Sequence, residues 1–136
     1  MESLEKIHPQ NNVAGLDYEN IPKIDVDLSG CWNNDSMSEV LIPIIKSMPF
    51  YRGDLLYSGF NANSIGKKEP PKSIFCATED TLFGNEETND PFYYAIKYKN
   101  PAIAIYDPTK MERKNNEAFT PTDSSALLGI ILLKGL

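Results

Sequence analysis

The chain is poor in the residues that metal sites and hydrolytic active sites most often use. It contains one histidine, His8, and two cysteines, Cys31 and Cys76. A zinc site needs about four cysteine, histidine or carboxylate ligands at characteristic spacing, and the sequence offers no such cluster. Catalysis by a serine or cysteine nucleophile with a histidine base would depend on His8, which lies in a polar leader. The composition therefore argues against a zinc protein and against a histidine-dependent hydrolase.

Long apolar segments are also missing. The N-terminus is rich in Glu, Lys and Asn and lacks the apolar region of a signal peptide. The longest apolar run, residues 126–133, has eight residues, whereas a membrane-spanning helix needs about 20. The two cysteines form no C-x-x-C motif, so we expect free, reduced thiols and a cytoplasmic site of action.

Positive charge is the third shortage. Thirteen Lys and Arg residues stand against 19 Asp and Glu residues, which gives a net charge of −6. Such a chain gains little from the phosphates of nucleic acids or from anionic membranes, so we expect neither as a partner. A local basic pocket is still compatible with this balance. The length of 136 residues and the hydrophobic fraction of 41% suit one globular domain.

The sequence does contain a series of short apolar runs separated by turns. Ten prolines and eight glycines predict many turns and no long helices. The apolar patterns predict strands at 24–28, 50–57, 73–78, 102–107 and 126–133, helices at 37–48 and 92–98, and connections at 58–72 and 111–121. We predict a polar arm over residues 1–22, flexible or laid along the surface, and one globular domain over residues 23–136. Its class is α+β, with a small mixed sheet of about five to six strands and one or two short helices.

Local signals refine two of these elements. Ser36 and Glu39 have the spacing of a capping box and predict the start of the first helix, in which Pro43 predicts a kink or a short length. Asp90 and the proline that follows it predict the start of the second helix. The only tryptophan, Trp32, is predicted to lie in the core or to hold the arm.

The stretch from Phe50 to Tyr57 places an arginine, Arg52, inside a predicted strand. A charge in that position needs solvent, a carboxylate such as Asp54, or an anionic ligand. Gly53 lets the backbone bend or approach a ligand closely. The nature of the partner of Arg52 is therefore the main question that the sequence raises.

Three segments together resemble the ADP-ribosyltransferase fold, particularly bacterial toxins and effectors of the arginine-serine-glutamate group. Tyr-Arg-Gly at residues 51–53 resembles the family's first-strand arginine motif. Phe-Cys-Ala-Thr-Glu at 75–79 resembles its aromatic-x-Ser-Thr-Ser strand. The helix and hydrophobic strand at 91–106, with an A-x-x-Y pattern, follow in the family's order. The resemblance covers about residues 50–133.

The resemblance implies that NAD is the cofactor and assigns roles to five residues. The residues implied to bind NAD are Tyr51, Arg52, Gly53 and Thr78, and the residue implied to be catalytic is Glu117. An arginine can bind phosphate or ribose through its planar fork, and a hydroxyl can hold the ribose. A carboxylate near the ribose can stabilise the positive charge that develops when the nicotinamide bond breaks.

The chain departs from the family pattern at two points. Residues 76–78 offer one hydroxyl where the family has three, and no E-x-E pair occurs between residues 100 and 136. Glu117 is the nearest candidate for the catalytic carboxylate, with Glu112 and Glu79 behind it.

Three functions follow from the sequence. The first is an NAD-dependent mono-ADP-ribosyltransferase, a bacterial effector or toxin that modifies a protein, in the cytoplasm or in the cytosol of a host. The alternative is a non-catalytic protein-interaction module, which can be a degenerate transferase. The third is a small structural domain without any relation to NAD.

Overall fold

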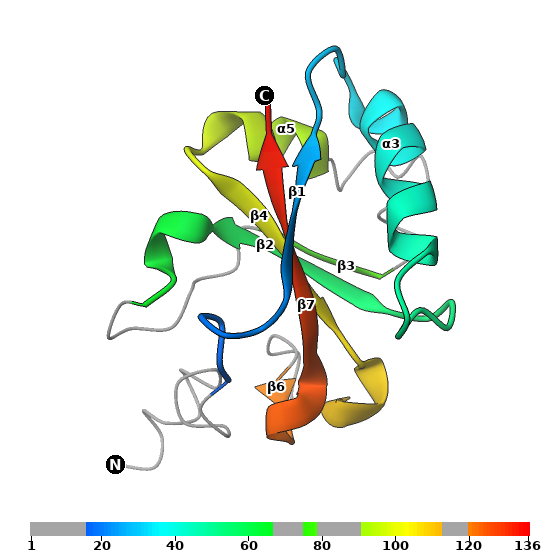
Figure 1. Cartoon of the computed structure of the whole chain (residues 1–136), viewed down its shortest axis with the longest axis vertical. Helices are drawn as coiled ribbons and strands as arrows, with labels where there is room; N and C mark the ends of the chain where they lie inside the picture. The colour runs from blue at the N-terminus through cyan, green and yellow to red at the C-terminus, as the bar shows by residue number, and fades with distance from the viewer. Residues whose placement is uncertain (1–15, 67–74, 79–90, 113–119) are drawn as a thin grey trace.

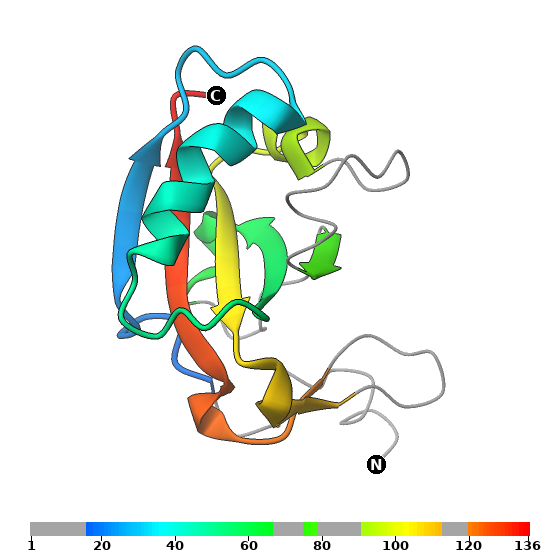
Figure 2. The same cartoon turned by 90° about the vertical axis from the view of Figure 1, so that its right-hand side faces the viewer.

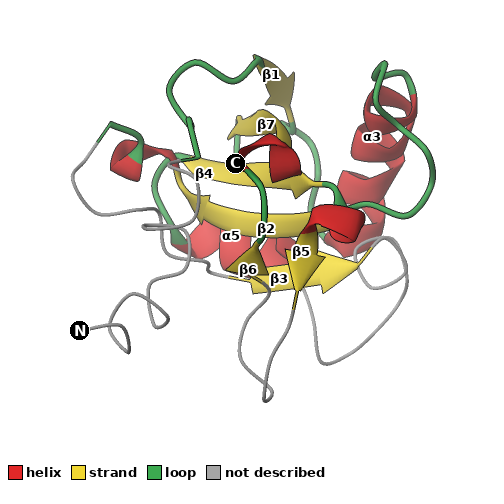
Figure 3. Cartoon of the chain, turned by 90° about the horizontal axis from the view of Figure 1, so that it is seen from below, coloured by secondary structure: helices red, strands yellow, loops and turns green. Residues whose placement is uncertain are grey.

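The computed structural model describes residues 16–66, 75–78, 91–112 and 120–136 (Figure 1). They form a mixed sheet whose strand order is β1-β7-β4-β2-β3, as Figure 3 shows. The strands of this sheet are β1 (Lys23–Asp27), β2 (Leu56–Asn61), β3 (Phe75–Thr78), β4 (Pro101–Tyr106) and β7 (Leu127–Lys134). Strands β1 and β7 are parallel, and the other neighbours are antiparallel. The predicted α+β class is confirmed.

Two α-helices lie in the described part of the chain, α3 (Asn34–Lys46) and α5 (Pro91–Lys97). Two short strands, β5 (Met111–Glu112) and β6 (Thr120–Pro121), pair with each other outside the main sheet. Three 3-10 turns complete the description: η1 (Ala62–Ser64), η2 (Pro108–Lys110) and η3 (Ser124–Ala126).

Strand β4 is buried on both of its faces because it lies in the middle of the sheet. Ile103 and Ile105 point to one face, where they join the apolar residues of α3 and α5 in one cluster. Ala104 and Tyr106 point to the opposite face. Figure 2 shows α3 lying across its face of the sheet. Each fully buried isoleucine contributes about 1.5–3 kcal/mol to the free energy of unfolding, so this strand anchors the fold.

The second face of the sheet is covered by the segment that precedes β1. Leu16 and Tyr18 are buried there, and the Tyr18 hydroxyl lies 2.7 Å from that of Tyr106. Burial raises the pKa of Tyr18, although the hydrogen bond to Tyr106 acts in the opposite direction. The amide of Ile130 donates to the carbonyl of Pro22 at 3.1 Å and fixes the end of this segment. Residues 16–22 thus lie along the sheet, and residues 1–15 of the predicted arm are outside the described residues.

The first helix begins earlier than its predicted capping residue. Its N-cap is Asn33, whose side chain accepts a hydrogen bond from the Ser36 amide at 2.8 Å. The hydroxyl of Ser36 accepts in return from the Asn33 amide at 3.1 Å, so Ser36 is the third helical residue. The predicted cap was wrong because asparagine caps a helix as well as serine does. Pro43 lies inside the helix, as predicted.

The strand that was predicted over residues 50–57 is displaced toward the C-terminus. Residues 50–55 form a loop, and the strand runs from Leu56 to Asn61, into the predicted connection. Gly53 has a φ of +97°, a left-handed backbone that a strand does not contain. Beyond it, Tyr57 and Phe60 are buried and continue the sheet.

The other predicted strands and the second helix are confirmed to within a few residues where they are described, and residues 73–74 lie outside that part. Of the two roles predicted for Trp32, a place in the core is wrong, because its exposed fraction is 76%, and a contact with the arm stays a prediction.

Candidate functional site

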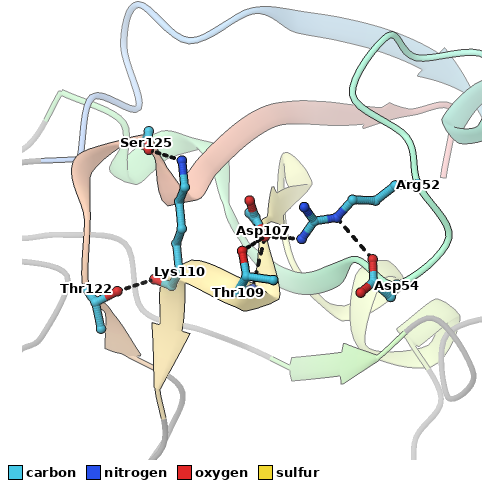
Figure 4. Close-up of polar contacts among 7 residues, drawn as sticks. All are labelled: Arg52, Asp54, Asp107, Thr109, Lys110, Thr122 and Ser125. Carbon is cyan, nitrogen blue, oxygen red and sulfur yellow. Dashed lines mark hydrogen bonds and ion pairs between the residues drawn. The ribbon is translucent and has the colours of Figure 1, made fainter.

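Arg52 lies in the loop between α3 and β2, and its guanidinium contacts two carboxylates (Figure 4). Nε donates to Oδ1 of Asp54 at 3.1 Å, and Nη2 donates to Oδ1 of Asp107. The exposed side-chain fractions are 40% for Arg52, 67% for Asp54 and 10% for Asp107. Of the partners considered from the sequence, the structure therefore shows carboxylates.

Asp107 directly follows β4 and is the buried member of this group. Its Oδ1 also accepts from the amide of Thr109 at 2.9 Å and from the Thr109 hydroxyl at 2.6 Å. Burial favours the neutral acid and raises the pKa of Asp107. The hydrogen bonds from Thr109, the hydrogen bond from Arg52 and the positive charge of Arg52 act in the opposite direction. Together they outweigh burial and lower the pKa of Asp107 below its usual value. Asp107 is accordingly an ionised anchor at the end of the central strand.

The turns around Asp107 are joined to each other by further hydrogen bonds. The Asp107 amide donates to the Ala126 carbonyl at 2.9 Å, which links the end of β4 to the start of β7. Lys110 Nζ bonds to the Ser125 hydroxyl, and the Thr122 hydroxyl donates to the Lys110 carbonyl at 3.0 Å (Figure 4). The carboxylate that holds Arg52 is therefore fixed by several independent contacts.

Thr78 lies at the same end of the sheet as Arg52. In the register of the sheet, Leu56 is opposite Thr78 on one side and opposite Tyr106 on the other. Thr78, the last residue of β3, therefore lies in the same row of the sheet as Leu56 and Tyr106. Leu56 begins β2 four residues after Arg52, and Tyr106 ends β4 one residue before Asp107. The Thr78 side chain is exposed.

The remaining predicted site residues differ in what the structure says of them. Tyr51 is half-buried and packs against the cluster beneath α3. The position where a side chain on Gly53 would begin has no atom within 4 Å, so there is open space beside this backbone. Glu117 and Glu79 lie outside the described residues, and Glu112 is exposed in β5. The catalytic role of Glu117 stays a prediction.

The charges around Arg52 determine which kind of chemical group this end of the sheet suits. Arg52, Asp54 and Asp107 together carry a formal charge of −1, which disfavours a phosphate. Nη1 of Arg52 has no hydrogen-bond partner among the described residues. The Arg52 side chain as a whole is partly exposed. The group therefore suits a neutral hydroxyl better than a phosphate.

Asp107 is the residue that the sequence did not single out. It is separated from Arg52 by 55 positions, and no local pattern connects the two. The available signal was the order Asp-Pro-Thr at 107–109, which is typical of an aspartate that accepts from the amide two residues later.

The described residues contain no group of three or more histidines, cysteines, aspartates or glutamates that could hold a metal ion. Within the same residues, no helix is long and apolar enough to cross a membrane. Comparison of the chain with family models, with curated proteins and with solved structures gave no match.

Proposed function

We propose that the chain binds NAD and belongs to the ADP-ribosyltransferase type, with a protein as the acceptor of ADP-ribose. The observation that supports this proposal is the register of the sheet, in which Leu56 pairs with both Thr78 and Tyr106. In that register Thr78, which carries a hydroxyl, lies at the end of the sheet where the loop with Arg52 leads into β2. An arginine and a strand hydroxyl at one end of a sheet are the two binding groups that the resemblance requires.

Arg52 acts in this proposal as an oriented donor. Asp54 and Asp107 fix two nitrogens of the guanidinium, and Nη1 is the nitrogen that the proposal leaves for the ligand. A donor held in place loses little side-chain entropy when a ligand binds. NAD supplies the ADP-ribosyl group and the nicotinamide leaving group. The Arg52 nitrogen and the Thr78 hydroxyl hold a ribose hydroxyl between them.

The proposal assigns the catalytic carboxylate to Glu117. This residue belongs to the connection between β5 and β6, and β5 directly follows the turn that contains Thr109. A carboxylate beside the ribose stabilises the positive charge that develops there. The resemblance is to bacterial effectors and toxins, so the proposal includes that the chain is a protein of this kind.

One observation favours the alternative, a non-catalytic protein-interaction module. The guanidinium of Arg52 already has two carboxylate partners, so its charge needs no ligand. In that case the same contacts serve the stability of the loop. NAD binding distinguishes the NAD proposal from a module that does not use NAD, and transfer of ADP-ribose distinguishes an enzyme from a non-catalytic module that binds NAD.

The binding experiment is amide NMR of the 136-residue chain during titration with NAD. We expect shifts at residues 51–53 and 75–78, and an affinity about tenfold lower in Thr78→Val, which keeps the shape of the side chain and removes the hydroxyl. Ser29→Ala is the control, because Ser29 also carries an exposed hydroxyl and follows β1 at the opposite end of the sheet. No shifts at millimolar NAD, or shifts confined to other residues, would contradict the NAD proposal.

A further inference from the structure

A pocket of about 440 Å³ opens at the end of the sheet opposite to Arg52. Residues 95–101, which end α5 and lead into β4, form one wall, and residues 133–136, which end β7, form the other. The register places this end far from the ion pair, because Asn61 is opposite Pro101 whereas Leu56 is opposite Tyr106. In Figure 1 the C-terminus and α5 lie together at this end. The volume lies within the range of about 300–1,000 Å³ that is usual for ligand pockets.

The pocket is basic although the chain is acidic. Lys97, Lys99 and Lys134 line it, and no carboxylate side chain does. All three are exposed, and in the described part of the chain none forms an ion pair. Lys97 instead lies over the ring of Tyr93, 4.9 Å from its centre. Asp27 sits beside Gly135 at the rim, where its carboxylate accepts from the Ser29 amide. The lining therefore includes three lysine residues, with the carboxylate of Asp27 beside Gly135.

Apolar side chains border the same opening. Ile96, Tyr98 and Leu136 line the pocket with exposed fractions of 50%, 43% and 42%. Large apolar groups that lie together on a surface are typical of a site that a partner covers. Isolated small anions such as phosphate would leave this apolar surface in water. The pocket therefore suits a ligand that combines negative charge with an apolar side chain.

The wall of the pocket is already formed without a ligand. Asn100 has a φ of +50° in the turn before β4, and its side chain donates to Asn63 at 2.7 Å. Its carbonyl accepts from the Ala62 amide at 2.8 Å. These bonds tie the turn to η1, so binding needs little ordering of the chain.

We propose that this pocket binds an acidic peptide segment of a partner protein. One apolar or aromatic side chain of the segment packs against Ile96 and Tyr98, and flanking carboxylates contact the lysines at positions 97, 99 and 134. Charge complementarity identifies the partner, since a pocket lined by three lysines and by no carboxylate side chain attracts an acidic segment. The proposal does not depend on NAD, because the two sites are at opposite ends of the sheet.

The test uses a short fluorescein-labelled peptide in which glutamates flank one leucine, and a matched peptide with lysines in place of glutamates. Fluorescence anisotropy should show binding of the glutamate peptide alone, weakened by salt. Lys99→Glu combined with Lys134→Glu should lower the affinity about tenfold or more. Lys46→Glu, at an exposed lysine at the end of α3, is the control for reversal of a single charge, to be compared with Lys99→Glu alone, and should change the affinity by less than about twofold.

Apolar recognition is tested by Ile96→Ser, with Trp32→Ser as the control because Trp32 is more exposed and does not line the pocket. Ile96→Ser should weaken binding, and so should a peptide with serine in place of leucine. Amide NMR shifts should fall on residues 95–101 and 133–136. No binding, equal loss in Lys46→Glu, or indifference to the leucine would each overturn the proposal. Self-association that the same lysine substitutions abolish would also overturn it, in favour of a second copy of this chain.

Discussion

The guanidinium of Arg52 donates to the carboxylate of Asp107, a residue 55 positions later in the sequence. This contact joins the loop before β2 to the turn after β4, and the strands β2 and β4 are neighbours in the sheet. A third residue, Thr109, gives two more hydrogen bonds to the same carboxylate oxygen. The arginine that the sequence marked for ligand binding is therefore part of the connections that hold one end of the sheet.

Asp107→Asn should lower the free energy of unfolding by about 1–3 kcal/mol, because it removes a charge to which Arg52 and Thr109 donate in a buried position. Urea unfolding measures the change. Asp54→Asn is the matched control and should alter stability by no more than about 0.5 kcal/mol, since Asp54 is largely exposed. Equal losses in the two variants would contradict the assignment of Asp107 as the anchor.

The stabilisation by Asp107 should depend on pH in a defined direction. The pKa of Asp107 in the folded chain is lowered from the ordinary value of 3.8, so the unfolded chain takes up the proton first as the pH falls. The contribution is therefore complete above pH 3.8 and is lost as the pH falls from there through the lowered value. The difference in stability between the natural chain and Asp107→Asn should be constant near neutral pH and shrink in acid. Asp17, Asp27 and Asp123 also have lowered pKa values, but they are present in both proteins. A difference that grows in acid would refute this prediction.

Tyr18→Phe should destabilise the fold by about 1 kcal/mol, because it removes the hydrogen bond to Tyr106 from a buried site. The measurement is again the free energy of unfolding. Tyr98→Phe, at an exposed tyrosine, should leave it within about 0.5 kcal/mol. If both variants behave alike, the segment of residues 16–22 does not contribute to stability through this contact.

Gly53→Ala should destabilise the loop by about 1–2 kcal/mol, since its φ of +97° disfavours any side chain. Steric contact is not the cause, because no atom lies within 4 Å of the added carbon. Gly53→Asn should lose less, because asparagine tolerates left-handed backbone better than alanine. The opposite order of the two variants would show that the loop adopts another conformation.

Glu117→Gln should abolish transfer of labelled ADP-ribose from NAD to protein in a cell lysate if Glu117 is the catalytic carboxylate. Glu112→Gln, in neighbouring β5, is the control and should retain labelling. Labelling that persists in Glu117→Gln excludes this residue from catalysis. NAD binding without labelling by the natural chain would support the non-catalytic alternative.

The parts of the fold that the sequence predicted are those set by continuous local patterns. Residues 102–107 and 126–133 are apolar runs bounded by turns, and both form strands that lie in the middle of the sheet. The start of α3 was misplaced by three residues because Asn33 and Ser36 have equivalent capping chemistry. The predicted strand over residues 50–57 failed at Gly53, whose backbone conformation depends on the loop around it.

The candidate site was less predictable, because its central contact is not local. Arg52 drew attention as a charge among apolar residues, but the sequence could not select Asp107 over other carboxylates as its partner. Burial of Asp107 arises from the meeting of the turns at 107–110 and 122–126, which only the folded chain brings together. Trp32 shows the same limit from the other side, because a large apolar side chain need not be buried.

The order of the strands leaves β1 at one edge of the sheet, and its side chains determine how that edge behaves in a crowded cell. Asp25 and Asp27 are exposed there. A neighbouring molecule that added a strand to this edge would have to bring its own backbone next to these charges and remove water from them. The charged edge thus opposes aggregation through strand addition.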